Sequence, residues 1–222
     1  MTACAVCGAP VQPPFRAPAP DGAPDLDLRP GEPARSTLPD WIASCPKCGA
    51  AGPDLSKLPP GTEKVVQSPQ YRSLLEPEWA RSHLRWAKIC EAAGDRRGQA
   101  EAMLQAAWAA DDSGDAVSAA AYRRQVAELW GESADLETAL RLLDVLRRAG
   151  EFERAEAAAA RLAGQDLEES AAVILAYQRD RIAMRDAGRH LLSSAIRPPA
   201  RTPHVAHGKQ ADAGFFSRFF KR

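Results

Sequence analysis

The chain has 222 residues, and its 29 lysines and arginines balance its 29 aspartates and glutamates. That length allows one or two domains, and a formal charge of zero argues against a basic surface that binds nucleic acid by releasing counterions. No apolar run approaches the ~18 residues that a membrane-spanning helix needs. Alanine is abundant and β-branched residues are scarce, which predicts a mainly α-helical fold rather than a large sheet.

Two cysteine motifs stand near the N-terminus, CAVCG at residues 4–8 and CPKCG at residues 45–49. Each motif places two thiols on one tight turn, and its glycine allows the positive φ that closes the turn. Two such turns facing each other supply the four sulfur ligands that tetrahedral zinc prefers. The predicted ligands of one structural Zn²⁺ are Cys4, Cys7, Cys45 and Cys48.

Disulfides, a thioredoxin-like redox pair, an iron–sulfur cluster and a redox-labile zinc are the competing interpretations of these cysteines. Residues 1–20 lack the charged and apolar regions of a secretory signal, so we expect a cytoplasmic protein whose thiols stay reduced. A redox pair needs a βαβ setting, whereas prolines follow the first motif. Four thiolates also close the coordination shell, whereas catalytic zinc keeps one position open for water. The predicted site is therefore structural.

The insert between the two cysteine motifs is rich in proline, alanine, glycine and aspartate, which predicts an irregular, partly ordered loop. Within it, residues 25–30 alternate leucine with charge, which predicts either one short strand or a turn in which Arg29 pairs with Asp25 or Asp27. The tetrapeptide before the second motif is predicted to be a strand, with Trp41 covering the small zinc core.

Three units are predicted in chain order: a zinc ribbon with a long proline-rich insert at residues 1–60, a helical repeat-like domain at 68–196 and a disordered tail at 197–222. In the helical unit, Ser68 and Pro69 supply an N-cap and a first-turn proline. Glycines then divide the 3.6-residue periodicity into six helices of roughly 12 to 20 residues. Their ends are predicted at Gly94, Gly114, Gly131, Gly150 and Gly164, with a helix start at Pro77, an N-cap at Ser133 and a capping-box-like start at Asp166 with Glu169.

Short connections make neighbouring helices antiparallel. The turn around Ala149, Gly150 and Phe152 looks like that of a tetratricopeptide repeat, although the glycines do not recur at a constant 34 residues. The predicted fold is therefore mainly α: a small N-terminal zinc ribbon, an α-helical tetratricopeptide-like hairpin array and a disordered C-terminal tail. An ordinary helical bundle is the alternative.

Cys90 and His83 share the apolar stripe of the helix that starts near Pro77. Because free cysteine is among the most buried residue types, Cys90 is predicted to lie in the core rather than to react. His83 is predicted to be a core histidine bonded to a backbone carbonyl. A hydrolase that uses His83 with a neighbouring acid is the alternative.

The last nine residues combine aromatic rings with three cations. Four phenylalanines are costly to leave in water, and one helical turn would gather them on one face. Such a face suits a groove on a partner or an anionic membrane surface, and folding back onto the helical unit is a further possibility. The aromatic residues are Phe215, Phe216, Phe219 and Phe220.

Four stretches of the sequence occur together: Cys4-x-x-Cys7-Gly8, Asp25-Leu26-Asp27-Leu28-Arg29-Pro30, Cys45-Pro46-Lys47-Cys48-Gly49-Ala50-Ala51 and Ala106-Ala107-Trp108. Over roughly residues 1–190 this combination resembles an uncharacterised bacterial family, a domain of unknown function that joins an N-terminal split zinc ribbon to tetratricopeptide-like helices. The resemblance implies a bacterial, cytoplasmic, metal-binding protein with no established activity. Members often carry an aromatic residue where this chain has Ala50, and the phenylalanine-rich end lies outside the resemblance.

Helical repeats form extended concave surfaces and rarely supply clustered catalytic groups. We therefore expect a non-enzymatic, zinc-binding adaptor or scaffold whose helical surface binds a protein or peptide. A nucleic-acid-associated regulatory protein that uses the zinc ribbon is the first alternative, although nucleic acid is not the expected partner. A hydrolase is the second.

Overall fold

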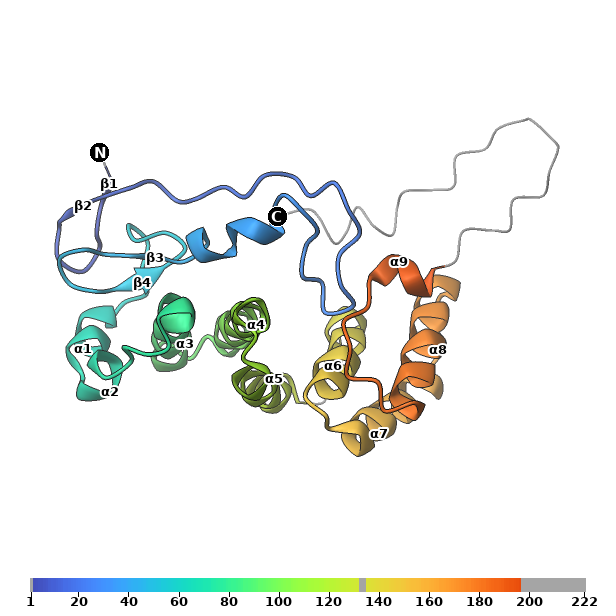
Figure 1. The fold of residues 1–222 in the computed structure, drawn as a ribbon. Helices are drawn as coiled ribbons and strands as arrows, with labels where there is room; N and C mark the ends of the chain where they lie inside the picture. The colour runs from blue at the N-terminus through green and yellow to red at the C-terminus, as the bar shows by residue number, and fades with distance from the viewer. Residues whose placement is uncertain (1, 132–134, 197–222) are drawn as a thin grey trace.

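The computed structural model describes residues 2–131 and 135–196 (Figure 1). The tail predicted at residues 197–222 and the cap predicted at Ser133 lie outside the described residues. Two short antiparallel ladders sit at the N-terminal end: β1 (Thr2–Ala3) pairs with β2 (Pro10–Val11), and β3 (Ala43–Ser44) pairs with β4 (Ala51–Gly52). Each ladder brackets one cysteine motif.

Helices form most of the described chain, and the predicted mainly α fold with small cysteine-bearing strands is confirmed. The α-helices are α1 (Thr62–Gln67), α2 (Pro69–Arg72), α3 (Arg81–Ala92), α4 (Arg96–Ser113), α5 (Ala116–Trp130), α6 (Leu136–Arg148), α7 (Phe152–Ala163), α8 (Glu169–Ala183) and α9 (Leu192–Ala195). Two 3₁₀ helices, η1 (Arg35–Asp40) and η2 (Glu78–Ala80), precede β3 and α3. Within the described ranges, no helix combines the length and the apolar content needed to cross a membrane.

The glycine-marked helix ends are confirmed. Gly114 and Gly150 follow α4 and α6 with φ of 77° and 78°, a conformation that costs glycine little because it has no Cβ. The chain then re-enters a helix at once, which produces the short antiparallel connections that the sequence predicts.

The predicted helix starts need three corrections. The first helix begins at Thr62 rather than at Ser68, although the Ser68 hydroxyl does cap α2 by accepting from the Tyr71 backbone N–H at 3.3 Å. Asp135 caps α6, because its carboxylate accepts from the Thr138 backbone N–H at 3.0 Å. At α8 the cap residue is Glu168 and no side chain accepts from the first turn, so the predicted Asp166–Glu169 capping box is wrong.

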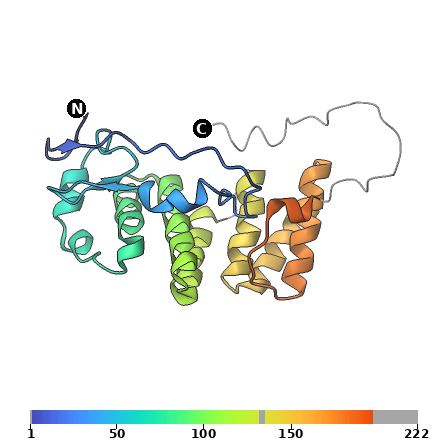
Figure 2. The same cartoon turned by 45° about the horizontal axis from the view of Figure 1, so that its top comes forward.

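The helices from α3 to α8 pack mainly against their sequence neighbours, and α6 also contacts α8. In Figure 1 they form a row, with the strands over α3 at one end and α9 beside α8 at the other, and Figure 2 shows the same row from a second direction. This is the contact pattern of consecutive hairpins. The tetratricopeptide identity of these hairpins stays a prediction.

The insert between the cysteine motifs is irregular but closely packed on the helices. We call residues 20–35 the strap. Leu26 donates its backbone N–H to His190 O at 3.1 Å, and Leu192 donates to Pro24 O at 2.8 Å. The strap therefore joins the segment before α9 to the middle of the helical row (Figure 1).

Residues 25–29 form a turn and not a strand. The Asp25 N–H donates to Arg29 O at 2.8 Å and Leu28 has a φ of 67°. The predicted pairing of Arg29 with an aspartate of this turn occurs only through the backbone, where the Arg29 N–H donates to Asp27 Oδ1 at 3.2 Å. The Arg29 guanidinium donates instead to the Asp112 carboxylate and to Trp108 O. Those partners belong to α4 and are brought to the strap only by folding.

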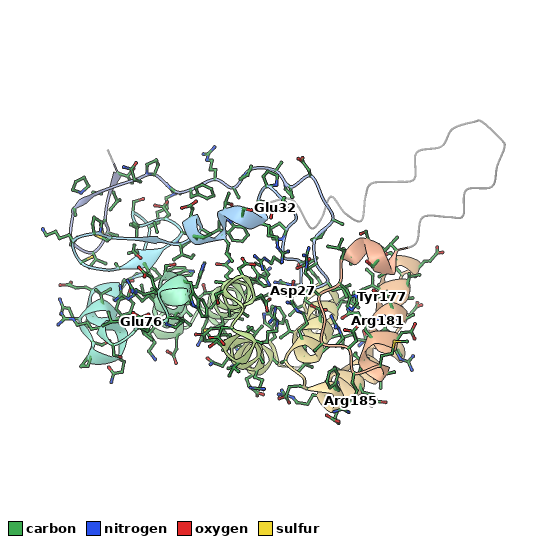
Figure 3. The ribbon with its side chains drawn as sticks, viewed as in Figure 1. Asp27, Glu32, Glu76, Tyr177, Arg181 and Arg185 are labelled. Atoms are coloured by element: carbon green, nitrogen blue, oxygen red, sulfur yellow. The ribbon has the colours of Figure 1, made fainter. Side chains whose placement is uncertain are left out.

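Asp27 lies at the centre of a buried network of charges, and Figure 3 places it between α4 and α6. Its carboxylate accepts from Trp108 Nε1 at 2.8 Å and from Arg148 Nη1 at 3.3 Å, and it lies 3.9 Å from Arg123 Nη2. Asp111 binds the same two arginines at 2.6 Å each. A shift of the strap along the helices would separate these ion pairs and leave buried charges unpaired, which is costly. The network therefore fixes the position of the strap relative to α4 and α6.

Trp41 does not cover the cysteines, contrary to the prediction. Its ring packs edge-on against Trp108 with centroids 6.2 Å apart, within the main hydrophobic core, to which the strap, η1 and α3 to α9 contribute. The predicted strand of residues 41–44 is reduced to Ala43–Ser44, because Trp41 is the C-cap of η1 and has helical φ and ψ.

Candidate metal centre

The two cysteine motifs fold into turns of the same geometry. In the first, Gly8 donates its backbone N–H to Cys4 O at 2.9 Å, and in the second Gly49 donates to Cys45 O at 2.9 Å. The two glycines have φ values of 69° and 75°, the left-handed conformation that the motif predicts. Each turn thereby directs two Sγ atoms to one side.

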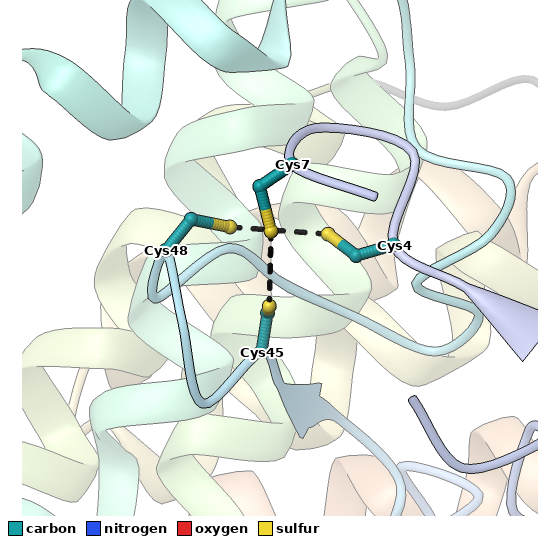
Figure 4. A group of neighbouring side chains, drawn as sticks. All are labelled: Cys4, Cys7, Cys45 and Cys48. Atoms are coloured by element: carbon teal, nitrogen blue, oxygen red, sulfur yellow. Dashed lines mark hydrogen bonds between the residues drawn. The ribbon is translucent and has the colours of Figure 1, made fainter. Parts of the chain in front are cut away.

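The four predicted ligands converge on one point, as Figure 4 shows. The Sγ atoms of Cys4 and Cys48 are 3.8 Å apart, and those of Cys7 and Cys45 are 3.7 Å apart. All four ligand atoms lie within 4.8 Å of one another. A tetrahedron of sulfurs at the usual Zn–S distance of about 2.3 Å has edges of about 3.8 Å, so the donor set fits a metal ion such as zinc.

The thiols have unequal acidities. Although burial raises the pKa of Cys45, the backbone N–H groups of Cys48 and Lys47 stabilise its thiolate and lower the pKa to about 7. Burial and the neighbouring sulfurs raise the pKa of Cys48 to about 12. The Cys45 thiol therefore loses its proton readily, whereas the Cys48 thiol resists deprotonation. A bound cation would offset the repulsion among the thiolates.

A small hydrophobic core lies behind the cysteines and includes residues from α1, α2 and α3. Tyr71 of α2 is 1 % exposed and donates its hydroxyl to Gly49 O at 2.9 Å. Burial raises the pKa of Tyr71 to about 12, so this hydroxyl keeps its proton. Arg85 of α3 stacks over the Tyr71 ring at 5.3 Å, and these contacts fasten the second cysteine turn to the helices.

Ala50 is fully buried against the cysteines, at the position where the similar family often has an aromatic residue. In place of Trp41, a buried cluster that includes Tyr71 and Ile89 packs with the cysteines. Sequence reasoning missed both residues, because no local motif marks a side chain that reaches the metal site through the fold of α2 and α3.

Cys90 and His83 are both buried. Cys90 is fully buried and burial raises its pKa to about 12, which confirms the predicted core position of an unreactive thiol. His83 is 1 % exposed, but neither of its ring nitrogens has a hydrogen-bond partner in the described structure. The predicted bond to a backbone carbonyl is therefore wrong.

One polar cluster was not anticipated from the sequence. Tyr177 Oη lies 3.0 Å from His190 Nδ1, and His190 Nε2 lies 2.7 Å from Asp186 Oδ2. Arg147 donates to the backbone oxygens of Asp186 and Gly188. These bonds hold the segment between α8 and α9 against the helical row, and Figure 3 places Tyr177 on α8.

Comparison of the chain with protein-family models, with curated proteins and with solved structures gave no match. The class that the fold and the site define is therefore coarse: a mainly helical protein with an N-terminal four-cysteine cluster suited to a metal ion. This class is compatible with a zinc ribbon followed by a helical domain, and the resemblance to the uncharacterised bacterial family still rests on the motifs.

Proposed function

We propose that this protein is a non-enzymatic cytoplasmic scaffold, in which one structural zinc holds the N-terminal segment on a helical array and the array binds a protein or peptide. The observation that carries the proposal is the combination of a closed four-thiol cluster with helices that pack in sequence order. Closed sulfur sites stabilise folds rather than activate water, and open helical rows expose long binding surfaces.

Zinc is the metal that the donor set favours. Four cysteine sulfurs at tetrahedral spacing suit zinc or an iron–sulfur cluster, and the two Cys-x-x-Cys-Gly turns have the spacing of structural zinc sites. Metal analysis of the purified protein, with a thiol count, tests this part. We expect one zinc per chain and four protected thiols; a zinc content near zero contradicts it.

The helical row offers a groove for a partner between α7 and α8. This open cavity of about 440 Å³ is walled by alanines such as Ala160 and Ala176, and Glu156 and Arg179 provide charge of both signs at its edge. Small side chains leave the helix backbones accessible to a bound segment, and the flanking charges can orient it.

The buried charge network supports a protein partner rather than a nucleic acid. Arg29, Arg123 and Arg147 are each almost fully buried in ion pairs, so these cations do not contribute to a phosphate-binding surface.

Ala160→Arg fills the groove with a long charged side chain, whereas Ala172→Arg adds the same side chain at an exposed α8 position outside it. Bead-bound wild type is used to capture partners from the native cytoplasm, and each captured protein is then purified and titrated. We expect binding to be lost with Ala160→Arg and kept with Ala172→Arg. Equal binding by both variants contradicts the groove as the partner site.

A further inference from the structure

A cavity of about 310 Å³ lies where the strap meets α9. Strap residues 20 and 22–24 line one side, and Leu192, Ser193 and Ile196 line the other. The two sides are joined where Leu192 donates its backbone N–H to Pro24 O at 2.8 Å. The cavity shares no lining residue with the cysteine cluster or with the groove between α7 and α8, and Figure 1 shows α9 at the end of the row opposite the cysteines.

The walls of this cavity are apolar. Among the described residues that line it, Ser193 alone has a polar side chain, and none carries a charge. Apolar walls that are open to water favour an apolar occupant, because its burial removes their surface from contact with water. A cavity of about 150 Å³ holds one benzene ring, so a cavity of about twice that volume has room for two aromatic rings.

The chain itself carries aromatic rings within reach of the cavity. Ile196 forms part of the wall, and Phe215, Phe216, Phe219 and Phe220 follow it after a linker of roughly 18 residues. A linker of that length is long enough to return to its own start, and it holds a tethered group near its site at a millimolar effective concentration. Weak binding of one or two rings is then enough to fill the cavity.

The charge at the rim of the cavity complements the same segment. Asp21 directly precedes the lining residue Gly22, is exposed, and has no ion pair among the described residues. Its backbone N–H donates to Glu32 O at 2.8 Å, so the exposed Glu32 adds a second carboxylate nearby. Residues 215–222 contain three cations beside the four rings, and these cations can pair with the two carboxylates while the rings enter the cavity.

We propose that this cavity binds the phenylalanine-rich segment of its own chain, residues 215–222, with one or two of the four rings inserted between the strap and α9. The groove between α7 and α8 suits these rings less, because Glu156, Arg179 and Asp180 place charges in its lining. The inference goes beyond the scaffold role and does not depend on that groove. A ring held in the cavity is unavailable to a membrane or to another protein, so docking and attachment exclude each other for that ring.

Fluorine spectra of the full-length, zinc-loaded protein test the docking. All 6 phenylalanines are replaced by 4-fluorophenylalanine, and the signals of the segment are identified by their loss when its four phenylalanines are changed to alanine. The free peptide of residues 209–222 gives the reference positions. We expect the segment signals of the protein to be displaced from these positions, by an amount that does not change on tenfold dilution.

Two substitutions on α9 form a matched pair. Ser193 and Ser194 are both exposed, but only Ser193 lines the cavity. Ser193→Trp supplies an indole that competes for the apolar space, so it is expected to reduce the displacement of the segment signals at least about threefold. Ser194→Trp adds the same side chain outside the cavity and is expected to leave the displacement unchanged.

The rim charge is tested by a second matched pair. Asp21→Asn is expected to reduce the docked fraction only about twofold, because an exposed ion pair contributes little. Asp166→Asn removes an exposed carboxylate between α7 and α8 and is expected to leave the docked fraction unchanged.

Methyl spectra report docking from the side of the cavity and do not depend on the tryptophan variants. Changing the four phenylalanines of the segment to alanine should shift the methyl signals of Leu192 and Ile196, which line the cavity. The methyl signals of Ile89, in the core beside the cysteines, should not move.

The proposal is overturned if the segment signals coincide with those of the free peptide until anionic vesicles are added, which assigns the segment to a membrane surface. A displacement that falls on dilution also overturns it and assigns the segment to a second copy of the chain. Equal effects of Ser193→Trp and Ser194→Trp, or unmoved methyl signals of Leu192 and Ile196, overturn it as well.

Discussion

Replacing Asp27 by alanine tests whether the buried charge network holds the strap on the helical row. The Asp27 carboxylate is fully buried and accepts from Trp108 Nε1 at 2.8 Å, from the Arg29 backbone N–H at 3.2 Å and from Arg148 at 3.3 Å. Removing one partner of a buried ion pair costs about 3–5 kcal/mol, and an unpaired buried N–H costs about 1–3 kcal/mol.

These contributions do not add fully, because Asp111 continues to bind Arg123 and Arg148. We therefore expect Asp27→Ala to lower the free energy of unfolding by about 3–4 kcal/mol. Urea titrations followed by circular dichroism and tryptophan fluorescence measure this loss. Asp21→Ala is the control, since Asp21 is exposed on the same strap and its side chain has no ion pair among the described residues; its effect should stay within about 0.5 kcal/mol.

The difference should also depend on pH. Burial alone would raise the pKa of Asp27, but the charges of Arg148 and Arg123 and the Trp108 hydrogen bond bring it below its ordinary value. A carboxyl with a depressed folded-state pKa stabilises the fold above its unfolded-state pKa, and the stabilisation is lost as pH falls through the folded-state pKa. The pKa of Asp144 is raised by burial and also by the charge of Asp27, so only the part of its contribution that comes from Asp27 enters the difference.

The gap between wild type and Asp27→Ala should thus be full at pH 7 and shrink below about pH 4. If Asp27→Ala unfolds within 0.5 kcal/mol of Asp21→Ala at pH 7, the reasoning about the network is wrong.

Three further predictions concern the metal site and the C-terminal end. Cys48→Ser should release the metal and abolish hydrogen-exchange protection in β1 to β4 while α5 to α8 stay protected; equal loss of protection in α7 and α8 would argue against two separable units. Tyr71→Phe removes the hydrogen bond to Gly49 O, so it should lower the free energy of unfolding by about 1 kcal/mol and speed zinc transfer to a chelator. An unchanged transfer rate would refute a positioning role for Tyr71. A peptide of residues 209–222 should bind anionic vesicles weakly, because two buried phenylalanine rings contribute about 3–5 kcal/mol. Added salt should weaken that binding. If a control peptide with the four phenylalanines changed to alanine binds with equal affinity, the prediction is wrong.

The features that sequence alone determined are local. A glycine just past an apolar helical stripe marks the helix end because it relieves backbone strain within a few residues, and Gly114 and Gly150 lie where this rule places them. The cysteine quartet was equally predictable, since each Cys-x-x-Cys-Gly turn closes on itself and the two turns together supply the four sulfurs of one tetrahedral site. The capping box predicted for α8 failed because several polar residues near a helix start compete for the same N–H groups.

Only the tertiary structure decided which distant residues meet. The Arg29 guanidinium binds Asp112 rather than Asp25 or Asp27, and Trp41 packs on Trp108 rather than over the cysteines. Ion pairs and aromatic contacts act over a few ångströms with little preference among partners of the same type. The choice therefore follows from how the strap lies on α4 and α6, which depends on the packing of the whole row and leaves no periodic signal in the chain.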